Sequence, residues 1–202
     1  MKIKYFALFA LLALLHLPYS CSTPEVTVKE YVITAMELKV VEIRKDLSNV
    51  IVRIEELSNV TDSLSIDEMA IQITPVFEIQ ERVISQVYGL MNSTYADPAP
   101  LQELRNPIIA IELYPTQSLA TASGYTAGGN NAILSFAAQF ANQQNMPVQD
   151  FLEQYVGTDV VEAFFLTLEE PLEEAFSGKF NMVIKLDGGT EFMAEVDPPR
   201  IH

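Results

Sequence analysis

The chain has 202 residues, 49% hydrophobic and 19% charged, so it is long enough and apolar enough to bury a core. Its formal net charge at pH 7 is -15, from 27 acidic and 12 basic residues. This charge repels phosphate backbones, so we expect no nucleic-acid partner.

The first 20 residues have the composition of a secretory signal peptide. Lys2 and Lys4 give a basic start, and the uncharged run 5–17 follows. This run is too short to span a bilayer, which needs about 20 apolar residues. Pro18 then ends any helix. We therefore expect residues 1–20 to be removed on export.

Cys21 follows the leader directly and is the only cysteine in the chain. It cannot form a disulfide within the chain, and it lies where bacterial lipoproteins carry their lipid-attachment cysteine. Pro18 and Tyr19 depart from the usual lipobox, so ordinary cleavage with an incidental cysteine stays as the alternative. We expect a lipid on Cys21, a short tether over 21–29 and one domain over 30–202.

Beyond the tether, apolar and polar residues alternate with period two, the pattern of strands with one buried face. In the first strand the apolar series shifts phase at Val40–Val41, which predicts a β-bulge. In a later strand Pro75 interrupts the alternation, which predicts an edge position or a bulge. The expected buried series are Met36, Leu38 and Val40; Val50, Val52 and Ile54; and Met69, Ile71, Ile73, Phe77 and Ile79.

Two long loops are expected in the middle of the chain, over 92–107 and 116–131. The strand between them is expected to bury Ile109, Ile111 and Leu113. Tyr95, Tyr114 and Tyr125 lie in or beside the loops. Exposed loop tyrosines often contact ligands or proteins, so these three are the candidate ligand-contact residues.

The segment 131–157 carries two helix-like patterns and predicts a two-helix insertion. The spacing i, i+3, i+4, i+7 joins Ile133, Phe136, Ala137 and Phe140, and then Val148, Phe151, Leu152 and Tyr155. Pro147 suits the first position of the second helix.

Strand patterns return after this insertion. Asp187-Gly188-Gly189 predicts a tight hairpin turn, because glycine accepts positive φ. The expected inward residues of these strands are Phe164, Leu166 and Leu168; Phe180, Met182, Ile184 and Leu186; and Phe192, Ala194 and Val196. The fold class is therefore predicted as mainly β. We expect an antiparallel immunoglobulin-like β-sandwich of about seven strands with a helical insertion at about 131–157.

The residues that usually carry catalysis are scarce. The two histidines are His16, in the leader, and His202, the last residue of the sequence. We therefore expect no catalytic triad, no metal site and no cofactor. Adjacent carboxylates occur at Glu55–Glu56, Glu169–Glu170 and Glu173–Glu174, but neighbours in a strand point to opposite faces. A carboxylate-dependent glycan hydrolase would need two carboxylates brought together across the fold, and it stays as an alternative.

Several segments resemble the uncharacterised envelope lipoproteins of Bacteroidetes, a β-sandwich type of unknown function. They are Cys21, the segment Tyr95-Ala96-Asp97-Pro98-Ala99-Pro100, the strand with Ile109, Ile111 and Leu113, the segment with Val148, Asp150, Phe151 and Leu152, and the terminal hairpin 180–201. The resemblance covers most of the chain after the leader. It implies an envelope lipoprotein to which no activity is assigned.

The leading expectation is a non-enzymatic binding, adhesion or scaffold module of the bacterial envelope. It would be an outer-membrane lipoprotein held by Cys21, with an envelope protein or a glycan as partner, and the leaflet stays open. The alternative from another class is a eukaryotic secreted glycoprotein. Its acceptor sites would be Asn59-Val60-Thr61 and Asn92-Ser93-Thr94.

Overall fold

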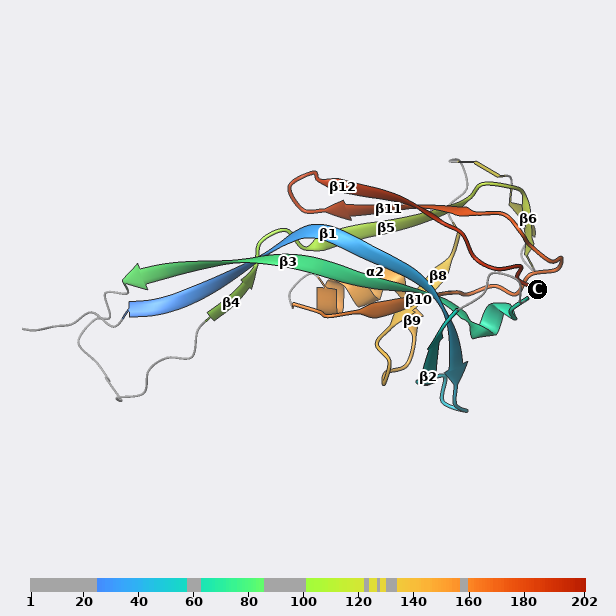
Figure 1. Cartoon of the computed structure of the whole chain (residues 1–202), viewed down its shortest axis with the longest axis horizontal. Helices are drawn as coiled ribbons and strands as arrows, with labels where there is room; N and C mark the ends of the chain where they lie inside the picture. The colour runs from blue at the N-terminus through green and yellow to red at the C-terminus, as the bar shows by residue number, and fades with distance from the viewer. Residues whose placement is uncertain are drawn as a thin grey trace, which may run out of the picture.

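A computed structural model describes residues 25–57, 63–85, 101–121, 124–126, 128–129, 134–156 and 160–202. Over these ranges the protein is mainly β, with antiparallel sheets, as the sequence predicts (Figure 1). Cys21, Tyr95 and both glycosylation triplets lie outside the described residues. Of the predicted tether, residues 25–29 belong to the first strand.

The larger sheet is built on two long strands, β1 (Glu25–Lys45) and β3 (Met69–Ser85), which pair along almost their whole length. β2 (Ile51–Glu56) and β4 (Leu101–Leu104) pair with the other edge of β1, and β4 is parallel to it. On the far side of β3 follow β10 (Phe164–Leu168), β8 (Phe136–Gln139) and β9 (Met146–Pro147).

The smaller sheet has the order β12 (Glu191–Val196), β11 (Phe180–Leu186), β5 (Ile108–Pro115). The turn between β11 and β12 is the predicted one, since Gly188 and Gly189 have φ of 89° and 86°. A separate ribbon pairs β6 (Leu119–Thr121) with β7 (Gly124–Thr126).

The main core lies between the two sheets and contains side chains from both. In β11 the predicted inward residues Phe180, Met182, Ile184 and Leu186 are at most 1% exposed, so this prediction is confirmed. Across the core, the ring of Phe164 in β10 lies 5.3 Å from the ring of Phe151. Phe140 in turn lies 4.9 Å from Phe151, which continues the aromatic cluster.

A second apolar cluster covers the opposite face of the larger sheet. It consists of Val41, Ile43, Ile51, Ala70 and Phe165. This cluster explains the phase shift at Val40–Val41, where the predicted bulge is wrong. The β1–β3 register is regular from Ala35 to Glu42, and its shift lies between Ile33 and Ala35. The apolar series changes face because the curled sheet buries its other side here.

The predicted two-helix insertion is wrong in its first half. The helix expected from Ile133 to Phe140 is replaced by strand β8, all four residues of which are buried. A strand buried on both faces loses its polar–apolar alternation, so its periodicity resembles that of a helix. The second helix is confirmed as α2 (Val148–Phe151), which runs directly into the π-helical turn η2 (Leu152–Val156). A short 3-10 turn, η1 (Ile66–Glu68), precedes β3.

The ends of β1 and β3 project beyond the two-sheet body, with β4 beside them (Figure 1). We call residues 25–33, 77–85 and 101–104 the arm. β10 pairs with β3 at Ile71 to Ile73, so within the described part of the chain no strand pairs with that edge of β3 further along. Pro75 lies in this unpaired stretch, as its predicted edge position requires.

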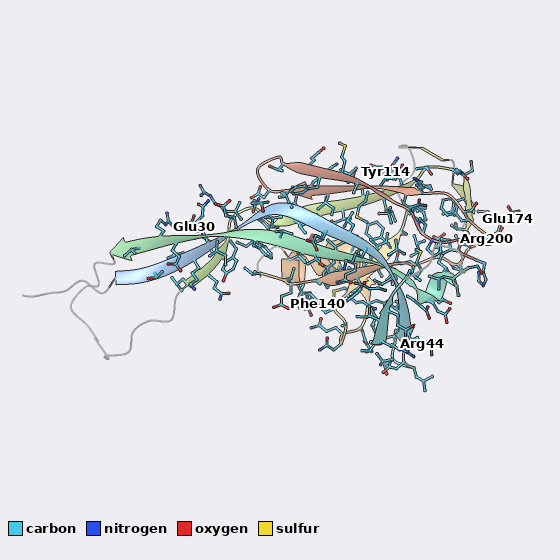
Figure 2. The ribbon with its side chains drawn as sticks, viewed as in Figure 1. Glu30, Arg44, Tyr114, Phe140, Glu174 and Arg200 are labelled. Carbon is cyan, nitrogen blue, oxygen red and sulfur yellow. The ribbon has the colours of Figure 1, made fainter. Side chains whose placement is uncertain are left out.

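A buried carboxylate joins the three strands of the arm (Figure 2). The side chain of Glu30 in β1 is 12% exposed, and it lies 3.2 Å from Arg82 in β3 and 3.4 Å from Arg105 after β4. Two guanidinium groups therefore compensate the one buried negative charge. This cross-strand network gives the projecting arm a fixed register.

Candidate functional site

Strand β1 has an unpaired edge between β4 and β2. It pairs with β4 from Val28 to Tyr31 and with β2 from Val41 to Lys45. The side chain of Asn106 closes the first part of the gap: its Nδ2 donates to the carbonyl of Ile33 at 2.9 Å, and its Oδ1 accepts from the Ile33 N–H at 2.7 Å. In the described residues, no strand pairs with this edge over 34–40.

A half-open cleft of about 270 Å³ lies beside this edge, where β12 of the smaller sheet contacts β1. The lining residues are Leu38 and Val40 of β1, Leu57 after β2, and Glu195, Val196, Asp197 and Pro199 at the end of β12. The apolar members adjoin the main core. The volume falls just below the range of about 300–1,000 Å³ typical of small-molecule sites, so the cleft suits a large apolar side chain.

Both carboxylates of the cleft share one lysine. Lys179 Nζ lies 2.5 Å from Glu195 and 3.5 Å from Asp197. The hydrogen bond to Glu195, and then the charge of Asp197, raise the pKa of Lys179 above its usual value. All three side chains are well exposed, so these ion pairs contribute little to the stability of the fold.

Of the three candidate tyrosines, the structure describes the side chain of Tyr114 alone. Tyr114 lies within strand β5, on the three-stranded sheet (Figure 2), and its hydroxyl donates to Glu112 at 2.6 Å. Lys185 of β11 donates to the other oxygen of Glu112, also at 2.6 Å. Tyr125 lies in strand β7, opposite Ala120. The structure therefore places Tyr114 in a network with Glu112 and Lys185.

The hydrogen bond from Lys185, and then the one from Tyr114, lower the pKa of Glu112. The same contacts raise the pKa of Lys185 and of Tyr114. A carboxyl group whose pKa is lowered in the folded state stabilises the fold at pH values above its ordinary, unfolded-state pKa. This contribution is lost as the pH falls through the folded-state pKa. The two raised values contribute stability that is lost only at alkaline pH.

Glu112→Gln is therefore expected to flatten the acid side of the stability profile. The wild type should lose more of its free energy of unfolding than the variant when the pH falls from neutral to below about 4.5. Urea unfolding at both pH values measures this difference. Glu162→Gln, at an exposed carboxylate outside this network, is the control and should follow the wild type. Parallel acid losses in Glu112→Gln and the wild type would contradict the role of Glu112.

The adjacent carboxylates Glu55 and Glu56 have different partners. Glu55 pairs with Arg53, whereas Glu56 pairs with Lys39 at 2.8 Å. Within the ranges that the structure describes, no group of three or more His, Cys, Asp or Glu side chains is placed to hold a metal ion. The same part of the chain contains no helix of the length and apolar character needed to cross a membrane.

Comparison with known proteins identifies no similar protein. The chain matches no family model, no curated protein and no solved structure.

Sequence reasoning did not identify the cleft, because its walls come from three distant segments. One signal was present: the phase shift at Val40–Val41 marks the point where β1 changes its buried face, and Leu38 and Val40 lie just before it.

Proposed function

We propose that the protein is an exported lipoprotein of the bacterial envelope, anchored in the outer membrane through Cys21. It acts as a non-enzymatic binding module that holds an extended segment of a partner envelope protein. The observation that carries this proposal is the unpaired edge of β1 over 34–40, which runs beside the apolar cleft. Its scaffold is a sandwich of immunoglobulin-like type, which the core shared by two sheets supports.

An unpaired strand edge and an adjacent apolar cleft are complementary requirements for binding an extended peptide. Main-chain N–H and C=O groups of the edge supply affinity, and a pocket for one side chain supplies specificity. Leu38 and Val40 contribute both parts, because they belong to the free edge and line the cleft. The partner segment is therefore extended and carries at least one large apolar side chain.

The anchor is supported by the leader and by the geometry of β1. This strand begins at Glu25, four positions after Cys21 in the sequence, so a lipid on Cys21 would anchor the chain through the arm. The part of β1 from residue 25 to 33 spans about 26 Å at about 3.3 Å per residue. The arm therefore separates the cleft, which lies at the body, from the membrane surface.

The test uses the full chain expressed in its native host. Leu57→Arg places a charge in the cleft wall, and Val52→Arg places the same charge on β2 at a side chain that is 65% exposed. Leu57→Arg is expected to lose at least tenfold of partner capture, whereas Val52→Arg keeps it. Circular dichroism and thermal unfolding check that both variants fold.

Hydrogen exchange adds a readout that is specific to the edge. Amides in 34–40 should become protected when the captured partner is present. Equal capture by Leu57→Arg and wild type, or unchanged exchange over 34–40, would exclude the cleft. Mass spectrometry of the mature N-terminus tests the anchor: acyl chains on Cys21 support it, and an unmodified N-terminus or a glycan at Asn59 or Asn92 contradicts it.

The cleft also keeps the hydrolase alternative open to test, since Glu195 and Asp197 line it. Glu195 lies in β12, and Asp197 follows two positions later, so both lie on one wall of the cleft. Both also contact Lys179. A glycosidase needs two carboxylates that flank the scissile bond. This arrangement favours the binding function. Release of sugars that disappears in Glu195→Gln would instead establish the hydrolase.

A further inference from the structure

The arm carries an edge that is open for pairing with another strand. Beyond Ile73 the edge of β3 has no partner strand in the described residues, and the side chains from Glu78 to Val83 are all exposed. Among them, Ile79 is 54% and Val83 is 59% exposed. A long exposed edge with apolar side chains is a template for pairing with another strand.

The sequence of this edge is complementary to its own reverse. Counted outward from Gln80, the residues two positions away are Glu78 on one side and Arg82 on the other. Three positions away are the apolar residues Phe77 and Val83. Two copies that meet antiparallel with Gln80 opposite Gln80 would therefore place Glu78 against Arg82 twice and Phe77 against Val83 twice, with Ile79 against Glu81 between them.

Symmetry leaves few other registers. A two-fold axis between antiparallel edges stands perpendicular to the sheet, so paired residues lie on the same face and one residue must oppose itself. With Glu81 on the axis, two like charges would lie directly opposite each other, which is destabilising. With Ile79 on the axis, the Glu78–Arg82 pairs would be lost and Arg82 would face Val76 instead. Gln80 is thus the favoured centre.

We propose that the protein forms a two-fold symmetric dimer in which the arms pair through residues 76–84 of β3, centred on Gln80. Glu78 makes no ion pair among the described residues and accepts one hydrogen bond, at 3.3 Å, from the exposed side chain of Gln80, so its carboxylate can still reach a second copy. Arg82 contacts Glu30 at 3.2 Å, yet its side chain is 59% exposed and remains accessible. The paired arms form one continuous sheet that buries both exposed edges.

The register is tested by single cysteines in the full chain carrying Cys21→Ser, which removes the only native thiol. Directly opposed residues have Cβ atoms about 4.5–5.5 Å apart, so Gln80→Cys is expected to form a disulfide-linked dimer with diamide. The matched control is Glu78→Cys, which would lie about 13 Å from its own copy and should not cross-link. Equal cross-linking at both positions, or none at position 80, would overturn the register.

The charge pairs are tested by reversal in the same Cys21→Ser background, with sedimentation equilibrium as readout. Glu78→Arg should weaken association about tenfold, because two attractive pairs become repulsive. Adding Arg82→Glu restores both pairs across the axis. Because this change also removes the contact between Arg82 and Glu30, the double variant is compared with Arg82→Glu alone and should associate more strongly than it. Circular dichroism confirms folding of each variant. A chain that is monomeric at all concentrations would refute the dimer. An association constant that does not change on charge reversal would also refute it.

Discussion

Phe164→Ala is expected to lower the free energy of unfolding by about 3–5 kcal/mol, the usual cost of truncating a fully buried phenylalanine. Phe164 is 0% exposed and lies in β10, the strand between β3 and β8. Its ring contacts Phe151, which in turn lies 5.4 Å from Tyr155. The truncation therefore leaves a cavity where the larger sheet meets the helical segment.

Urea unfolding followed by circular dichroism measures this loss. Phe192→Ala is the matched control, because Phe192 lies on β12 at the border of the same core and is only partly buried. It should cost clearly less, since solvent already reaches its ring. A loss below about 1 kcal/mol for Phe164→Ala would show that the aromatic cluster does not form the centre of the core.

The strands of the terminal hairpin could be predicted from the sequence because each buries one face only. In β11 the alternation from Phe180 to Leu186 matches the buried positions without exception. The glycines of the turn have the positive φ that their sequence predicts. Local pattern and tertiary environment agree here, so period two suffices.

Bulges and doubly buried strands could not be predicted in the same way. Ile109 was expected inside, yet it is 50% exposed, because the β5–β11 register shifts between Lys185 and Leu186 and turns it outward. In β2 the buried residue is Ile51, whereas Val52 is exposed, because the β1–β2 register shifts at this end of the strand. Such shifts depend on the partner strand, which the local pattern does not contain.

The candidate site depends even more on long-range contacts. The cleft unites Leu38, Leu57 and Pro199, which are far apart in the sequence. No motif joins them, and each alone is an ordinary apolar residue. Tyr114 was selected because it lies beside a loop. In the structure its hydroxyl donates to Glu112 of the same strand, which also accepts a hydrogen bond from Lys185. Residue type alone does not reveal such partners.

Gln139 is the clearest conflict between residue type and environment in the described structure. It lies in β8 opposite Phe165, a member of the second apolar cluster, and it is 0% exposed. Neither Nε2 nor Oε1 has a hydrogen-bond partner in the described residues. A buried amide without partners costs about 1–3 kcal/mol, because water has been removed and nothing replaces it.

Gln139→Leu is therefore expected to raise the free energy of unfolding by about 1–3 kcal/mol, since leucine has a similar size and suits the apolar surroundings. The control Gln143→Leu, at an exposed position in the turn before β9, should change it by less than about 0.5 kcal/mol. Urea unfolding measures both. A destabilised Gln139→Leu would mean that the amide makes a hydrogen bond in solution. A stabilised one would establish that the outer face of the larger sheet is a second hydrophobic core, which the curl of β1 requires.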